Sequence, residues 1–365
     1  MTNHFRTLGA IALVIASLTS CNENDGPDGP VIDPVETTTG AIIINQGVYN
    51  ANIAGSLTYI DFVTQQADQK VFENANGTTV LGDTPQSVFV YGSKMYVALY
   101  GSNLIRVLDV KNFKEIKRIT PTASTGTQPR YFAADGKKVY VTMFDGYVAR
   151  IDTTSLEIDA SVKVGPNPDG IAVCNGYVYA ANSDGMNYME NYANGNTVSK
   201  IDIATFTEKQ KINVGMNPGA MAATESDVFV IVRGNYGAIP SMLKKINSDG
   251  SLEEIGTATY VSATRNQVLY VHAPYGQPLG AVSCYTPRDG SIQSITLSSP
   301  VEFPAAFEAD EVSKTIIITG YKTNAGVADY MSVGFANLYD NTGKLIKTYA
   351  TGHNPCGITF KTLLQ

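Results

Sequence analysis

The chain has no tryptophan and only three histidines, His4, His272 and His353. It also lacks a CxxC pair, a glycine-rich phosphate loop and the GxSxG turn that exposes a catalytic serine. An enzyme needs an acid and a base, a nucleophile or a metal cluster that act together. The oxygen-rich run 182–185 resembles part of a calcium loop but lacks a full ligand set. We therefore assign no catalytic residue and no metal-binding residue.

Charged side chains are also scarce. Charged side chains make up 16% of the 365 residues, and the formal net charge at pH 7 is -7. A protein that binds nucleic acid releases counterions from the phosphates with clustered Lys and Arg side chains. The chain has no basic stripe of this kind, so we expect no nucleic-acid partner.

The N-terminal segment has the pattern of an export signal. Arg6 precedes the apolar run 8–18, which is too short to cross a bilayer as a helix. Leu18, Thr19, Ser20 and Cys21 then resemble the bacterial lipoprotein cleavage box, in which the cysteine is lipidated. We expect residues 1–20 to be a lipoprotein signal peptide and residues 21–39, which are acidic and rich in Gly and Pro, to be a flexible tether. The alternative is a plain secreted protein in which Cys21 is incidental.

A motif repeats along the rest of the chain. A turn with proline leads into a small or apolar run, a tight turn follows, and an alternating apolar strand comes next. The anchors of the seven copies are Pro85, Pro129, Pro168, Pro218, Tyr260, Pro304 and Pro355. Their spacing of roughly 40 to 50 residues is typical of β-propeller blades.

The repeats predict an all-β fold, a seven-bladed β-propeller of four-stranded blades over residues 40–365. The chain begins with a second strand at 41–46 and ends with a first strand at 357–363. We therefore expect the two ends to share one blade, whose outermost strand is 69–72, and to close the ring without an open sheet edge. A β-sandwich or a solenoid is the alternative, and neither needs such complementary ends.

The two faces of this ring differ in sequence. Tight turns such as Asp135-Gly136 lie on one face, whereas the proline turns and longer loops lie on the other. Aromatic rings and amides on a rigid rim suit a large, mostly uncharged, polar ligand. The alternative is that the loop tyrosines only cover the blades and that His353 has a structural hydrogen bond. The candidate ligand-binding residues on this rim are Tyr49, Asn50, Tyr100, Gln128, Arg130, Phe144, Asn167, Asn182, Tyr188, Arg233, Tyr236, Tyr275, Tyr321 and His353.

The lipoprotein box at Cys21, the acidic tether and the sevenfold repeat together resemble the YncE-like surface lipoproteins of Bacteroidetes, and most closely their BtuG cobalamin-binding type. The resemblance implies a protein held by lipid in the outer membrane and exposed at the cell surface. It also implies non-covalent capture of cobalamin (vitamin B12) or another corrinoid and delivery to a BtuB-like TonB-dependent transporter. On this interpretation the protein is not an enzyme and has no cofactor of its own, since cobalamin is the transported ligand.

Three other functions remain open at this point. The first is a glycan-binding lipoprotein of a polysaccharide-uptake system. The second is a surface-layer or adhesion protein, and the third is a propeller lyase or hydrolase. The absence of tryptophan counts against glycan binding, although tyrosine can also stack on a sugar ring.

Overall fold

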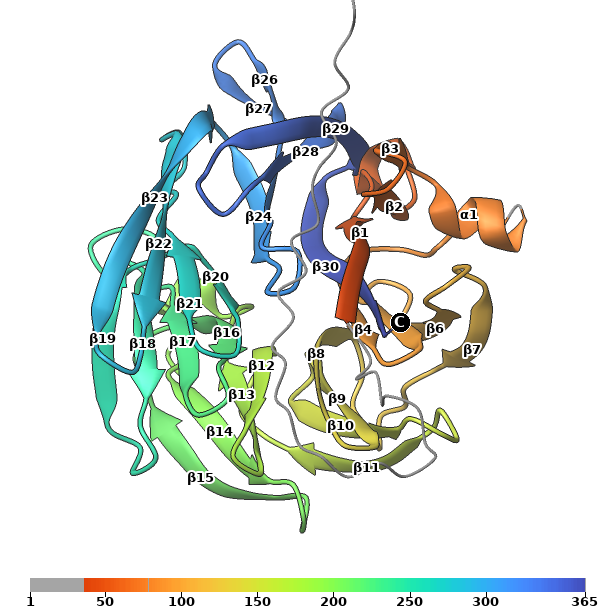
Figure 1. Ribbon diagram of the computed structural model, residues 1–365. Helices are drawn as coiled ribbons and strands as arrows, with labels where there is room; N and C mark the ends of the chain where they lie inside the picture. Colours follow the sequence, from red (N-terminus) through yellow and green to blue (C-terminus); the bar gives the residue numbers. More distant parts are fainter. Residues whose placement is uncertain (1–35, 78, 365) are drawn as a thin grey trace, which may run out of the picture. The chain divides into compact units, whose positions relative to one another are not determined.

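The computed structural model describes residues 36–77 and 79–364, which form seven four-stranded antiparallel sheets arranged in a ring (Figure 1). The prediction of a seven-bladed β-propeller is confirmed. The predicted signal peptide lies outside the described residues, and so does the predicted tether except for residues 36–39. Those four residues form the start of the first strand, β1 (Glu36–Asn45).

Each blade is one sheet, and its first strand is the innermost. Blade 1 contains β30 (Pro355–Leu364), β1, β2 (Ser56–Asp61) and β3 (Gln66–Asp68). Blade 2 contains β4 (Pro85–Tyr91), β5 (Lys94–Leu99), β6 (Leu104–Asp109) and β7 (Glu115–Ile119). Blade 3 contains β8 (Pro129–Asp135), β9 (Lys138–Met143), β10 (Tyr147–Asp152) and β11 (Ile158–Lys163). Blade 4 contains β12 (Pro168–Cys174), β13 (Tyr177–Asn182), β14 (Thr197–Asp202) and β15 (Thr207–Asn213).

The remaining blades complete the ring. Blade 5 contains β16 (Pro218–Ala223), β17 (Val228–Val232), β18 (Met242–Ile246) and β19 (Leu252–Thr257). Blade 6 contains β20 (Tyr260–Ala263), β21 (Val268–Val271), β22 (Leu279–Thr286) and β23 (Ser291–Val301). Blade 7 contains β24 (Pro304–Ala309), β25 (Ile316–Gly320), β28 (Val333–Tyr339) and β29 (Leu345–His353). A separate hairpin, β26 (Lys322–Asn324) with β27 (Val327–Asp329), projects from blade 7 (Figure 1).

The core lies between neighbouring blades rather than within one sheet. Successive side chains of a strand point to opposite faces of its sheet. In β1, Ile42 and Ile44 therefore pack against blade 2, whereas Ala41 and Ile43 pack against blade 7. The same alternation gives one buried apolar cluster at each of the seven blade junctions.

The two ends of the ring meet in blade 1, as the sequence predicts. β30 pairs antiparallel with β1, with Ile43 opposite Ile358 and Glu36 opposite Leu364. Each sheet edge at the closure point is thereby paired, which removes a template for aggregation.

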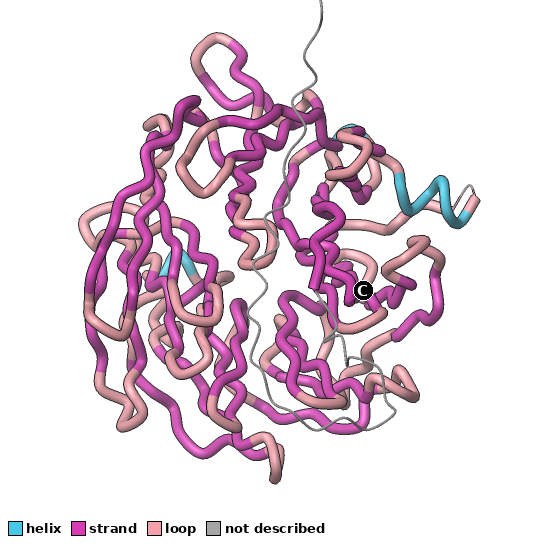
Figure 2. Tube along the Cα trace, in the orientation of Figure 1, coloured by secondary structure: helices cyan, strands magenta, loops and turns pink. Residues whose placement is uncertain are grey.

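Helical structure is sparse in the described residues (Figure 2). It consists of α1 (Val71–Asn76) and the single 3-10 turns η1 (Tyr49–Ala51) and η2 (Tyr188–Glu190). The prediction of an outermost strand at 69–72 is wrong, because the strand ends at Asp68 and helix α1 begins at Val71. The side chain of Asn76 donates hydrogen bonds to the carbonyls of Phe72 and Phe113, at 2.8 and 2.9 Å, and so ties the helix to blade 2.

Candidate functional site

In five of the six proline turns that precede a first strand, the residue before the proline adopts an unusual backbone geometry. Side chains other than glycine seldom take a positive φ, and asparagine tolerates it best. The N–H groups of Tyr100 and Phe144 donate to the carbonyls of Thr84 and Gln128, at 3.0 Å in both cases. The turn into the first strand thus fixes the loop after the second strand. Five residues share this geometry: Thr84 (φ 48°), Gln128 (62°), Asn167 (44°), Asn217 (58°) and Asn354 (53°).

These turns deliver the first strands to a large pocket, which we call the central cavity. Its volume is about 1190 Å³. The first strands of all seven blades line it, together with loop residues after the second strands of blades 5, 6 and 7. The loops that contribute to the cavity after the second strands therefore come from one side of the ring, blades 5 to 7.

Four of the predicted rim residues line the central cavity: Arg233, Tyr236, Tyr275 and Tyr321. Tyr236 and Tyr275 are 74% and 72% exposed, so their rings are free to meet a ligand. Tyr321 packs edge-on against Tyr330, with ring centroids 4.7 Å apart. Tyr275 lies 5.5 Å from the ring of Phe303. The loops of blades 5 to 7 thus present an aromatic wall.

On another part of the ring, two arginines converge on one buried carboxylate. Arg130 Nη2 lies 2.8 Å from Asp169 Oδ1, and Arg233 Nη1 lies 2.7 Å from Asp169 Oδ2. Burial disfavours the charged form of Asp169, but the two guanidinium groups outweigh that effect and lower its pKa to about 2. We call these three residues the arginine clamp. It carries one net positive charge, because two cations share one anion.

Local packing explains why the arginine clamp is rigid. The guanidinium of Arg130 lies 4.7 Å from the ring centre of Phe144 and 5.8 Å from that of Tyr100. Arg233 covers Gly219, where an added Cβ would lie 2.2 Å from Arg233 Cζ, so only glycine fits beneath it. Of the predicted rim residues, Tyr100 and Phe144 pack on Arg130, which is linked to Arg233 through Asp169, and these three do not themselves line the cavity.

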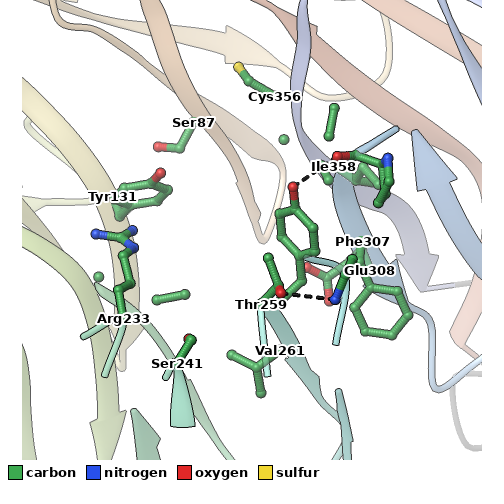
Figure 3. Close-up of a pocket in the computed structure, with 18 of the residues that line it drawn as sticks. Ser87, Tyr131, Arg233, Ser241, Thr259, Val261, Phe307, Glu308, Cys356 and Ile358 are labelled. Atoms are coloured by element: carbon green, nitrogen blue, oxygen red, sulfur yellow. Dashed lines mark hydrogen bonds between the residues drawn. The ribbon is translucent and has the colours of Figure 1, made fainter. Parts of the chain in front are cut away.

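A second carboxyl group, that of Glu308 in β24, lines the cavity, and its pKa is shifted in the opposite direction. The side chain of Glu308 accepts a hydrogen bond from the hydroxyl of Ser262 in β20. Burial raises the pKa of Glu308 to about 7. Figure 3 shows Arg233 and Tyr131 on one side of the pocket, and Glu308 and Phe307 on the other. The two walls of the cavity thus differ in charge.

Several phenol groups also line the cavity. Burial raises the pKa of both Tyr131 and Tyr260 to about 12, so both phenols stay protonated at neutral pH. The Tyr260 hydroxyl donates to the carbonyl of Pro304 at 3.0 Å. A protonated phenol both donates and accepts hydrogen bonds, which suits a ligand with amide or hydroxyl groups.

Three predicted rim residues have structural roles instead. Asn182 is fully buried, and its amide bonds Thr197, Ser199 and the N–H of Gly165. Gln128 and Asn167 occupy the positive-φ position before a proline. The residue type at these positions follows from backbone geometry and internal hydrogen bonds rather than from a ligand.

The last four predicted residues lie away from the lining of the central cavity. Tyr49 and Asn50 are exposed on η1, and Tyr188 is exposed on η2. His353 is half-buried at the end of β29, where its carbonyl accepts a hydrogen bond from Gly47 at 3.1 Å. None of these four residues is part of the cavity lining.

The sequence analysis missed the lining residues that come from the first strands, among them Ser87, Tyr131, Tyr260 and Glu308. Their position relative to the proline turns is a signal that the sequence contains. Ser87 and Tyr131 lie two residues after Pro85 and Pro129, and Glu308 lies four residues after Pro304. Consecutive residues of the first strands line the cavity, such as 86–89 and 304–308, so the signal is nearness to the proline turn rather than alternation along the strand.

Residues 36–77 and 79–364 contain no group of three or more His, Cys, Asp or Glu side chains positioned to hold a metal ion. No helix in this part of the chain is both long and apolar enough to cross a membrane.

Comparisons with known proteins give a family and a fold. A family model described as a domain of unknown function (DUF5074) matches residues 39–354. No curated protein matches the chain. The chain is similar to the hydrazine synthase of Kuenenia stuttgartiensis, with 15% identity, a TM-score of 0.58 and coverage of 75% of this chain and 88% of that chain. It also matches the computationally designed Ika8 protein at 12% identity and a TM-score of 0.49, over 76% of this chain and 90% of that one. At 15% identity the likeness to the synthase shows a shared fold alone.

Proposed function

The chain belongs to the DUF5074 family of domains of unknown function, and we propose that it is a cell-surface lipoprotein that captures cobalamin or another corrinoid in the central cavity. It then delivers the ligand to a BtuB-like TonB-dependent transporter in the outer membrane. The observation that carries the proposal is the cavity itself, with its size, its aromatic wall and its few charges.

Size favours a bulky ligand. Pockets for drug-sized molecules measure about 300–1,000 Å³. The central cavity, at about 1190 Å³, is larger than that range. A macrocycle with long side arms suits such a volume better than a single sugar or a nucleobase does.

The lining chemistry also matches a corrinoid. Its broad, largely apolar ring edge suits the aromatic wall of Tyr236, Tyr275, Tyr321 and Tyr330. Its peripheral amides can exchange hydrogen bonds with the phenols and hydroxyls of the cavity. The part of the lining that belongs to the first strands sits on sheets that pack on both sides, so little freedom is lost there when a ligand binds.

The location rests on the sequence of the N-terminal segment. The lipoprotein box at Cys21 and the acidic run after it support a lipid anchor and exposure at the cell surface. Each buried acyl CH₂ contributes about 0.8 kcal/mol to membrane binding, so a lipidated cysteine would hold the protein on the membrane. The proposal contains no chemical step and assigns no catalytic residue.

Glycan binding in a polysaccharide-uptake system is the second candidate. Exposed, rigidly mounted tyrosines favour it, because Tyr236 and Tyr275 offer flat faces to a sugar ring. It accounts less well for the volume of about 1190 Å³, which suits a compact macrocycle better than an extended sugar chain.

Isothermal titration of the folded protein with cyanocobalamin and with a panel of oligosaccharides separates the two. We expect saturable binding of cyanocobalamin and none of the panel. Binding of an oligosaccharide alone would replace the first candidate by the second, and chemical turnover of any of these ligands would contradict the assignment as a carrier.

A further inference from the structure

Glu308 is a carboxyl group without a cation. It projects from β24 into the central cavity, at the position four residues after Pro304. No ion pair to it is found among residues 36–77 and 79–364. The hydroxyl of Ser262 donates to its Oε1, and the same hydroxyl accepts a hydrogen bond from the N–H of Ala309 at 3.1 Å. Ser262 is thereby held in place as a fixed donor, and the carboxyl group is oriented by it.

The wall around Glu308 is apolar. Val261, Phe307 and Ile358 line the same part of the cavity (Figure 3). A carboxylate in such surroundings is destabilised unless it is paired and hydrogen-bonded. The nearest second acid, Asp310, is already engaged by the hydroxyls of Thr38 and Ser313 and adds negative potential.

Glu302, the other carboxyl in the lining, is exposed and accepts a hydrogen bond from the hydroxyl of Thr323, so water can solvate it. Asp169, the buried carboxyl behind Arg233, is fully paired. Asp169 has two guanidinium partners, whereas Glu308 has one serine hydroxyl as its side-chain partner in the described residues. A buried acid that the fold leaves without a cation, on the wall of a cavity of about 1190 Å³, has room for a partner from outside.

We propose that Glu308 and Ser262 form a subsite that binds a nitrogen hydrogen-bond donor of the ligand, a primary carboxamide or an ammonium group. The inference rests on the proposed function only in that a ligand occupies the cavity. The carboxylate accepts the N–H group, and Ser262 keeps the carboxylate in position. On the opposite wall, Arg233 donates hydrogen bonds to carbonyl or anionic oxygens of the same ligand, so the cavity distinguishes the two ends of a polar molecule.

The first test is calorimetric titration of cyanocobalamin into the wild type and two variants. A hydrogen bond to a charged group contributes about 1.5–3 kcal/mol, so Glu308→Ala should weaken binding about 10- to 100-fold. Glu308→Gln keeps a neutral acceptor and should weaken binding less. Glu254→Gln is the matched control, because Glu254 lies on the outermost strand of blade 5, where it pairs with Lys244, and it should bind as the wild type does. A single cooperative thermal unfolding transition verifies that each variant is folded. Wild-type affinity in folded Glu308→Ala, within twofold, would overturn the subsite.

A second measurement does not depend on the corrinoid. The side-chain carboxyl ¹³C signal of Glu308, assigned by comparison with Glu308→Gln, is followed while butyramide, butylammonium chloride or sodium butyrate is added. We expect a saturable shift with butyramide or butylammonium and none with butyrate, and the more effective probe identifies the group that the subsite prefers. If the wild type binds no cyanocobalamin but a nitrogen probe shifts this signal, the corrinoid function fails and the subsite stands. If neither nitrogen probe shifts it, the subsite is wrong whatever the corrinoid does.

Discussion

Two carboxyl groups beside the same cavity show opposite behaviour. Asp169 is 3% exposed and has a pKa of about 2, because Arg130 and Arg233 both pair with it. Glu308 has a pKa of about 7, because burial is opposed only by hydrogen bonds. The comparison teaches that burial alone does not decide ionisation, since the available partners do. On one wall of the cavity the buried carboxylate is paired with cations of the protein. On the other wall, Glu308 has no such partner in the described residues, and a ligand can supply one.

The largest effect should follow from breaking the arginine clamp. Asp169→Asn leaves Arg130 and Arg233 without their shared anion, and loss of one partner from a buried ion pair costs about 3–5 kcal/mol. We expect the free energy of unfolding, measured by urea denaturation at pH 7, to fall by that amount. Glu254→Gln, which removes an exposed pair with Lys244, should change it by less than about 0.5 kcal/mol. A loss of under about 1 kcal/mol in Asp169→Asn would mean that the clamp does not stabilise the fold.

The pH dependence of the clamp has a definite sign. The folded-state pKa of Asp169, about 2, lies below its ordinary value of 3.8. Its contribution is therefore fully present above pH 3.8 and is lost as the pH falls through about 2. The wild type should lose about 2 kcal/mol over this window through this group, and Asp169→Asn should not.

Glu308 should give the opposite pH dependence. Its folded-state pKa of about 7 exceeds its ordinary value of 4.5, so the folded protein keeps a proton that the unfolded chain releases. Stability contributed in this way is present below pH 4.5 and is lost as the pH rises through about 7. Because Glu308 is partly open to the cavity, we expect a modest decrease of about 1–3 kcal/mol in the free energy of unfolding. Glu308→Gln should abolish this slope in urea titrations at pH 4.5, 6 and 8, and an identical slope in wild type and variant would assign it to another group.

Asn167 tests the turn that delivers Asp169 to the clamp. It has φ 44°, and its side chain donates to the carbonyl of Phe144 and accepts from the N–H of Met186, both at 3.1 Å. Asn167→Ala should lower the free energy of unfolding by about 1–2 kcal/mol, since alanine tolerates this φ poorly. Asn167→Gly restores the backbone freedom but not the two bonds and should lie between alanine and wild type. If glycine were no better than alanine, the hydrogen bonds rather than φ would fix this position.

The smallest effect concerns the aromatic wall. Tyr236→Ala and Tyr275→Ala should each weaken cyanocobalamin binding about 3- to 10-fold, the equivalent of one aromatic contact. Stability should stay within about 0.5 kcal/mol, because both side chains are largely exposed. Tyr49 and Tyr188 are 81% and 63% exposed but lie outside the cavity lining, so their alanine variants should bind as the wild type does. Weaker binding in those two variants alone would move the site from the cavity to the outer loops.

The architecture was predictable because its signals are local and repeated. Proline turns and alternating apolar runs recur in every blade, and the unmatched strands at the two ends predict the shared blade. Arg233, Tyr236, Tyr275 and Tyr321 were predicted as rim residues because loop length and residue type are visible in the sequence.

The pairing within the cavity was not predictable in the same way. Asp169 meets arginines from blades 3 and 5, and Glu308 meets a serine from blade 6. These contacts depend on how neighbouring blades are rotated against each other, which no single repeat encodes. At Asn167 and Asn182 the amide serves a positive φ or internal hydrogen bonds, and the sequence does not distinguish this use from contact with a ligand.

The shared blade also constrains how the protein is made on the ribosome. β1 is synthesised first, but its partner β30 follows all the other strands in the chain. Until β30 emerges, β1 keeps one unpaired edge and the ring stays open. An aggregation-prone strand edge is therefore exposed for almost the whole time of synthesis. Export before folding, or a chaperone that covers β1 during that interval, would spare the nascent chain this hazard.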